Sequence, residues 1–196
     1  MAFWNDSSVE PKRGFRWLLY LENPQGGFET YVVRDVTKPA FTISETPVKY
    51  IAHTFKYPGR LTWNNVTVNL IDPIVPDTSA ILTRILQSSG YKLPETEEAA
   101  KFAFSKRTAS NALGTPRLEQ IDAGITPLAA TKDNPARRPK AVEEWSLVNA
   151  WVSAVTFGSL NYTNEELVAV QLTIVYDYAM YQGDFDGRKL SPVMYS

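Results

Sequence analysis

The chain has 196 residues, 44% of them hydrophobic, and its 20 basic and 21 acidic side chains give a formal net charge of −1. This size and composition are typical of one globular domain with a packed core. The near-neutral balance argues against a dedicated nucleic-acid-binding protein, which normally carries a basic excess. The sequence contains no cysteine, so disulfides, thiolate metal sites and cysteine nucleophiles are excluded.

The sequence predicts a protein that is made in a reducing cytoplasm. Residues 1–6 lack a basic region followed by an apolar run, so we expect no secretory signal. No apolar run reaches the roughly 18 residues needed for a membrane-spanning helix. We therefore expect no membrane insertion by the chain itself.

Two strands are expected in the first forty residues. Residues 14–21 place alternate apolar side chains on one face, which is typical of a half-buried strand. Residues 22–27 contain a proline and a glycine pair and predict a turn. Residues 28–37 then predict a second strand.

The segment 31–72 predicts a strand, a long excursion and another strand. Residues 31–37 and 61–71 alternate apolar and polar side chains, whereas residues 38–60 do not and contain three prolines. The excursion is nevertheless rich in apolar side chains: Phe41, Ile43, Val48, Tyr50, Ile51, Phe55 and Tyr57. A solvated hairpin tip does not need this much apolar surface. We interpret the excursion as an arm that projects from a β scaffold and packs on something else.

Helical periodicity appears after this segment. Residues 76–86 carry one apolar stripe and a capping residue at Asp77 or Thr78, so they predict a helix that lies against the sheet. Residues 94–110 predict a second helix, whose acidic start and basic Lys106–Arg107 end suit the helix dipole. We treat about residues 92–140 as an insertion that contains one short strand at 117–122.

The last third of the sequence predicts two long strands. Residues 144–158 are apolar on both faces, which indicates a strand covered on both sides. Residues 166–178 alternate again after a turn and run back beside it. Nine or so strands around one clear helix predict a β-rich α+β fold, most simply a small barrel or sandwich with a flanking helix.

No residue pattern predicts catalysis or a cofactor. His53 is the only histidine and has no cysteine to share a metal with. The acidic cluster at 95–98 is explained by a helix start, and Asp184–Gly187 lacks the later ligands of a calcium loop. The basic groups at 106–107 and 137–140 are interpreted as solvated or subunit-facing charges. We expect a protein that is not an enzyme and has no cofactor or metal.

The order of these features resembles the tail tube proteins of contractile-tailed bacteriophages, whose fold is shared with the haemolysin-coregulated tube protein of type VI secretion. The resemblance depends on Thr37–Phe41, on Phe55-x-Tyr57-x-Gly59-x-x-Thr62-Trp63 leading into 66–72, and on the closing segments 151–158 and 170–178. It implies a single tail-tube domain over 1–196, built as a six-stranded antiparallel barrel with a flanking helix, and assembly into hexameric rings.

The same resemblance implies a structural virion protein that polymerises as stacked rings into a hollow channel for genome ejection. Its partners would be copies of itself, tail sheath and baseplate proteins, and double-stranded DNA that passes without specific binding. It would be assembled in the host cytoplasm and located in the phage tail.

The resemblance also assigns expected roles to particular residues. The arm Ser44–Arg60 would reach the adjacent ring through Pro47, Val48, Tyr50, Ile51, His53, Phe55 and Tyr57. The alternating polar residues Thr67, Asn69, Gln171 and Thr173 are candidates for the channel wall. The alternative for this face is an ordinary solvent-exposed sheet.

Three other functions remain open from the sequence. A tube-initiator or baseplate-junction protein would have the same fold and stack at one end only. A tube protein of a type VI-like secretion system would also match. A carbohydrate-binding β module using exposed tryptophan and tyrosine side chains belongs to a different class, and it would bind glycans as a monomer.

Overall fold

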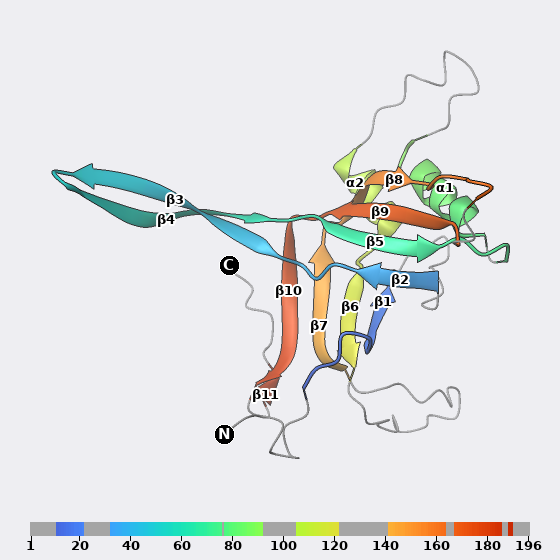
Figure 1. Cartoon of the computed structure of the whole chain (residues 1–196), viewed down its shortest axis with the longest axis horizontal. Helices are drawn as coiled ribbons and strands as arrows, with labels where there is room; N and C mark the ends of the chain where they lie inside the picture. The colour runs from blue at the N-terminus through green and yellow to red at the C-terminus, as the bar shows by residue number, and fades with distance from the viewer. Residues whose placement is uncertain are drawn as a thin grey trace, which may run out of the picture.

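The structure is a computed structural model that describes residues 11–21, 32–75, 77–91, 105–121, 141–163, 167–185 and 188–189. The strands of these residues are β1 (Trp17–Tyr20), β2 (Val33–Val36), β3 (Phe41–Tyr50), β4 (His53–Trp63), β5 (Val66–Ile71), β6 (Arg117–Ile121), β7 (Ala141–Val148), β8 (Trp151–Thr156), β9 (Ala169–Val175), β10 (Tyr178–Phe185) and β11 (Arg188–Lys189). The helices are α1 (Thr78–Ser88) and α2 (Lys106–Leu113). The expected β-rich α+β class is confirmed (Figure 1).

The strands form two antiparallel sheets and a separate hairpin. One sheet has the order β1-β6-β7-β10-β11, the other has the order β2-β5-β9-β8, and β3 pairs with β4 alone. In Figure 1 the strands of the four-stranded sheet run across those of the five-stranded sheet. The core contains side chains from both sheets and both helices: Leu19, Val68, Leu70, Leu82, Ile85, Leu113, Leu118, Leu147, Leu172 and Ile174.

The expected closed six-stranded barrel is wrong, because the described strands form two sheets whose edges are not joined by ladder pairs. At two places the chain instead passes from one sheet to the other across only two residues, and we call these the sheet crossings. Between β7 and β8 it turns through Asn149, whose φ of 53° is left-handed, and through the fully buried Ala150. Between β9 and β10 it turns through Tyr176 and Asp177. The strand expected at 144–158 is therefore divided between the two sheets, whereas the strand expected at 166–178 is β9 and ends before the second crossing.

The two sheet crossings are bonded to each other. The Asp177 N–H donates to the Val148 carbonyl at 3.1 Å, and Asn149 Nδ2 donates to an Asp177 carboxylate oxygen at 2.8 Å. Lys106 Nζ at the start of α2 donates to both oxygens of that carboxylate. Hydrogen bonds from Lys106 and then Asn149 hold the pKa of Asp177 below its ordinary value. One carboxylate thus joins both crossings to α2.

Other element boundaries differ from the sequence expectation. The strand expected at 61–71 is interrupted at Asn64 and Asn65, because the Asn64 N–H donates to the Ala40 carbonyl at the base of the hairpin. The first two strands are shorter than expected, and residues 28–31 lie outside the described residues. The predicted short strand at 117–122 is confirmed as β6.

The first helix is confirmed, and Asp77 caps it by accepting from the Ala80 N–H at 2.8 Å. The second helix begins later than expected. Ser105 is extended and acts as its N-cap, so Lys106 lies at the start of α2 rather than near the end of a longer helix. Residues 94–104 lie outside the described residues. No helix in the described ranges is long and apolar enough to cross a membrane.

The segment treated as an insertion contributes to the body of the fold. Its residues 117–121 form β6, which pairs with β1 on one side and β7 on the other. Its helix α2 packs against α1 and β8. Residues 92–104 and 122–140 lie outside the described residues, and an insertion relative to other tube proteins stays a prediction.

Candidate assembly surfaces

The β3–β4 hairpin, called the arm from here on, extends away from the rest of the molecule (Figure 1). Every residue from Phe41 to Thr62 is exposed. The strands are paired from Phe41–Trp63 at the root to Tyr50–His53 at the tip, where Ile51 and Ala52 form the turn. An isolated two-stranded hairpin is marginally stable in water, so an exposed one of this length is expected to gain stability from a partner.

The outer arm has one apolar face and one charged face. Residues that are paired across a ladder share a face, and successive pairs alternate between faces. The pairs Thr46–Tyr57, Val48–Phe55 and Tyr50–His53 therefore form one face, which is mainly aromatic and aliphatic. The pairs Glu45–Pro58, Pro47–Lys56 and Lys49–Thr54 form the other. Lys56 and Glu45 are ion-paired on that second face at 2.9 Å.

A β-bulge separates the outer arm from its root. The register shifts between Ile43 and Glu45, and Ser44 Oγ accepts from the Arg60 N–H at 2.9 Å. A Cβ on Gly59 would lie 2.4 Å from Ser44 Oγ, so the close approach at the bulge requires glycine. Along β3 the apolar residues change from odd positions at the root to even positions beyond the bulge. The apolar face of the outer arm is therefore not the face that contacts the body.

Aromatic side chains anchor one side of the arm root. The rings of Phe41 and Trp63 meet edge to face with centroids 5.3 Å apart, and Trp63 lies 5.9 Å from Tyr176. Tyr176 is part of the core, and burial raises the pKa of its hydroxyl. These contacts connect the exposed hairpin to the buried crossing between β9 and β10.

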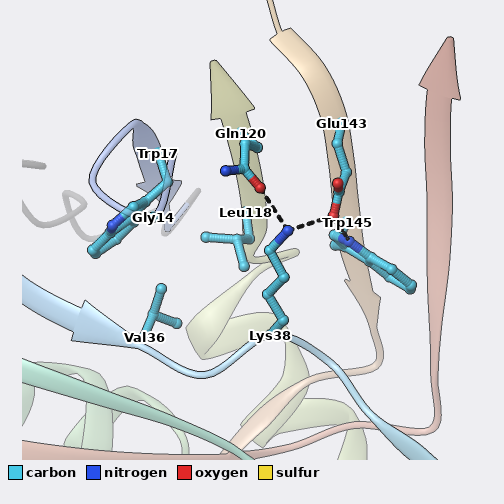
Figure 2. Close-up of a pocket in the computed structure, with 8 residues that line it drawn as sticks. All are labelled: Gly14, Trp17, Val36, Lys38, Leu118, Gln120, Glu143 and Trp145. Carbon is cyan, nitrogen blue, oxygen red and sulfur yellow. Dashed lines mark hydrogen bonds and ion pairs between the residues drawn. The ribbon is translucent and has the colours of Figure 1, made fainter. Parts of the chain in front are cut away.

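A buried carboxylate contacts the arm root at Lys38 (Figure 2). Glu143 of β7 is paired with Lys38, which precedes β3, at 2.8 Å and with Lys12 through its second oxygen. Trp145 Nε1 donates to the same carboxylate at 2.6 Å. Burial alone would raise the pKa of Glu143, but the hydrogen bonds from Lys12, Lys38 and Trp145 outweigh it and lower the pKa from 4.5 to about 2.

A small cavity of about 90 Å³ adjoins this carboxylate, lined by Gly14, Trp17, Val36, Lys38, Leu118, Gln120, Glu143 and Trp145. We call Lys12, Lys38, Gln120, Glu143 and Trp145 the Glu143 junction. Sequence reasoning missed it, because its two lysines lie 131 and 105 residues from Glu143 in the chain. The available signal was a pair of acidic residues, Glu143 and Glu144, at the start of an amphipathic strand.

The four candidate channel-wall residues lie together on one face of the four-stranded sheet. Thr67 pairs with Thr173 and Asn69 with Gln171 across β5 and β9, while their neighbours Val68 and Leu172 point into the core. The side chains are bonded across strands. Gln171 Nε2 donates to Asn69 Oδ1 at 3.2 Å, and Asn69 Nδ2 donates to Asp35 Oδ1 of β2 at 2.6 Å. The face is thus polar and internally hydrogen-bonded.

An apolar hollow of about 790 Å³ lies at β8, an edge strand that pairs only with β9 in the described part of the chain. Its walls include Leu86 of α1, Ala109 of α2 and Trp151, Val155 and Phe157 on and just after β8. The Lys106–Asp177 ion pair also lines it. No pattern in the sequence points to this hollow, because it depends on how α1 and α2 meet the sheet.

The remaining candidate residues are not brought together into a site. His53 is exposed on the arm, 6.0 Å from the ring of Phe55. Pro47 lies on the charged face and Ile51 in the turn, so five of the seven expected contact residues share the apolar face. The groups at 95–98 and 137–140 lie outside the described residues. No three metal-ligating side chains cluster in the ranges that the structure describes.

Comparison with known proteins identifies the fold through structure alone. No family model matches the sequence, and no curated protein matches it. A chain from the baseplate of the anti-feeding prophage matches with a TM-score of 0.60 at 10% identity, over 89% of this chain and 97% of that one. A chain from the cap that terminates the tube of the same particle matches with a TM-score of 0.58 at 16% identity, over 94% and 100%.

A third similar chain comes from the sheath–tube complex of an extracellular contractile injection system, PVC, in its extended state. It matches with a TM-score of 0.55 at 13% identity, over 94% of this chain and 99% of that one. These matches span almost the whole length of each chain, so the likeness concerns the complete fold and not a shared substructure. The chain therefore has the tail tube fold that its sequence suggested.

Proposed function

We propose that this protein is a tail tube subunit, which assembles as stacked hexameric rings into a hollow channel for genome ejection. The fold likeness to chains of contractile injection particles supports a structural role in such a tube. In this proposal the partners are further copies of the chain, the tail sheath and the baseplate, and the location is the tail of a virion.

The observation that carries the proposal is the one-sided apolar arm. Tyr50 is 66% exposed, Phe55 51% and Tyr57 58%, and all lie on one face of a hairpin that has no other layer over it in the described residues. Contiguous exposed apolar surface on a soluble protein marks an interaction site. A projecting element that binds a different surface of the next copy makes a heterologous contact, which closes into rings or extends into filaments.

The four-stranded sheet supplies the other features that a tube needs. Its edge strands are β2 and β8, and joining β8 of one copy to β2 of the next would satisfy both edges and continue the sheet around a ring. The polar face with Thr67, Asn69, Gln171 and Thr173 would then line the channel. Its amides are neutral and bond to one another and to the Asp35 carboxylate, which suits the passage of DNA because phosphate contacts supply most nonspecific affinity.

A tube-initiator or tube-end protein is the second candidate. The likeness to chains from a baseplate and from a tube-terminating cap favours it, because such proteins need the same fold but stack on one side only. The arm would then contact a different tube protein rather than a second copy.

Electron microscopy and analytical ultracentrifugation of the purified full chain test the proposal. A tube subunit is expected to form rings and hollow tubes without other proteins. Rings that never stack would favour the tube-end protein, and a monomer at high concentration would contradict both functions.

A further inference from the structure

Lys38 connects the arm root to the five-stranded sheet, with which the arm shares no ladder among the described strands. Lys38 lies in the segment 37–40 between β2 and β3. Its Nζ donates to Gln120 Oε1 of β6 at 2.6 Å and to Glu143 Oε1 of β7 at 2.8 Å. Figure 2 shows Lys38 reaching up from the arm root between these two acceptors. The connection therefore crosses from one sheet of the body to the other.

The same acceptors also hold the segment before β1. Lys12 Nζ donates to Glu143 Oε2, and Gln120 Nε2 donates to the Arg13 carbonyl at 2.9 Å. Trp145 Nε1 also donates a hydrogen bond to Glu143 Oε1. Both carboxylate oxygens and both ends of the Gln120 amide are thus used, and three segments distant in the sequence meet at one buried position.

We propose that Glu143 is a positioning residue for the arm, which sets the direction of the hairpin before any second copy binds. The inference rests on the proposed function, since the direction matters only if the arm is an assembly element. The aromatic contact of Trp63 holds the end of β4, and an arm held only there could rotate about that contact. Lys38 on Glu143 holds the segment that leads into β3 and so gives the root a second anchor.

The environment of the carboxylate makes this second anchor stronger than a surface ion pair. The Glu143 side chain is 8% exposed, whereas the Lys38 side chain is 49% exposed. A buried charge that is fully hydrogen-bonded attracts its partner more strongly than one in water, and removing the partner leaves an uncompensated charge. An arm whose root is fixed in this way loses less conformational entropy when it binds a partner.

The choice of variant separates positioning from general stability. Lys38→Met breaks the connection to the arm but leaves Glu143 bonded to Lys12 and Trp145, so the buried charge stays compensated. Glu143→Gln removes the negative charge and replaces one of the two acceptor oxygens by an NH2 donor. Lys56→Met is the matched control, because it removes a lysine from an ion pair within the arm, where both partners are exposed.

The distance from arm to body can be measured within one chain. Because the sequence has no cysteine, Lys49→Cys on the arm and Arg84→Cys on α1 give two defined spin-label positions, both exposed. The doubly labelled full-length chain is mixed with an excess of unlabelled chain. Double electron–electron resonance then reports only the distance between the two labels of one chain. Thermal unfolding by circular dichroism is recorded for each variant.

The parent and Lys56→Met are expected to give a narrow distance distribution. Lys38→Met is expected to broaden or shift it while the thermal transition stays close to that of Lys56→Met. A folded Glu143→Gln protein should show the same change in the distance distribution, together with a lower thermal transition. An unchanged distribution in Lys38→Met would overturn the inference, as would broadening equal to that of Lys56→Met. Because the readout needs no assembly, it stands apart from the proposed function, which fails separately if the chain never forms rings.

Discussion

At the scale of single residues, the pH dependence of stability should reveal Glu143. Its pKa is about 2 in the folded chain and 4.5 when unperturbed, so the folded state binds this proton less readily. The stabilisation is therefore fully present above pH 4.5 and is lost as the pH falls toward 2. The shift corresponds to roughly 3 kcal/mol of unfolding free energy. Denaturant titrations at a series of pH values should show this loss in the parent.

The Glu143→Gln variant is the control for this titration. It is expected to be less stable than the parent at neutral pH and to lose less stability between pH 4.5 and 2, so that the two curves converge. Parallel curves over that range would show that other carboxylates dominate the acid response.

A second residue-scale prediction concerns Gly158, which follows β8. Its φ is +75°, and a Cβ there would lie 2.6 Å from the Ala169 carbonyl oxygen. Gly158→Ala is therefore expected to lower the free energy of unfolding by about 1–3 kcal/mol, the usual cost of strained backbone. Gly14→Ala, which meets no atom within 4 Å, is expected to change it far less. Equal urea midpoints for the two variants would contradict the assigned strain.

At the scale of elements, the two faces of the arm should have different effects on assembly. The double variant Tyr50→Ser/Phe55→Ser removes apolar surface from one face and is expected to leave a folded subunit that does not polymerise. Lys49→Ser/Lys56→Ser alters the opposite face of the same strands and is expected to polymerise. Circular dichroism checks folding, and sedimentation with electron microscopy checks assembly.

The outcome of this pair distinguishes three situations. Loss of assembly in both variants would mean that the shape of the hairpin matters more than its apolar face. An unfolded Tyr50→Ser/Phe55→Ser protein would mean that the arm belongs to the core. Normal tubes from that variant would contradict the proposed role of the arm.

The elements also show what the sequence could and could not predict. The arm was predictable because Phe55 and Tyr57 lie in a proline-containing stretch that otherwise looks like a solvent-exposed loop. Such loops rarely carry several aromatic side chains, so these residues indicated a packing surface. The sheet crossings were not, because the apolar alternation from Trp145 to Val155 continues while the chain passes through Asn149 into another sheet. Periodicity reports whether a residue is covered, and it does not report which sheet covers it.

The same limit applies to interactions between distant segments. The polar face of β5 and β9 followed from alternation within each strand, so its four residues were found together. The Glu143 junction needs Lys12 and Lys38 to meet β7, and no local pattern in a single sequence encodes a contact over more than a hundred residues.

At the scale of the whole molecule, the strongest test asks which surface becomes the interior of an assembly. If the four-stranded sheet faces a channel, Asn69→Lys/Gln171→Lys places cations inside the tube. DNA that enters the channel would then pass these cations at every ring. Asn111→Lys places a cation on an exposed position of α2, on the other side of the core. Parent tubes are expected to retain little DNA, because Thr67, Asn69, Gln171 and Thr173 are uncharged and Asp35, which bonds to Asn69, is an anion.

Tubes of the Asn69→Lys/Gln171→Lys variant are expected to retain short double-stranded DNA with an affinity that falls steeply with salt, since each phosphate contact releases counterions. The retained DNA should be protected from nuclease, because only DNA inside a channel is shielded along its length. DNA bound by Asn111→Lys tubes should stay sensitive to nuclease. If both variants bind nuclease-sensitive DNA equally, the sheet with Asn69 and Gln171 faces outward, and the channel must be formed by another surface of the fold.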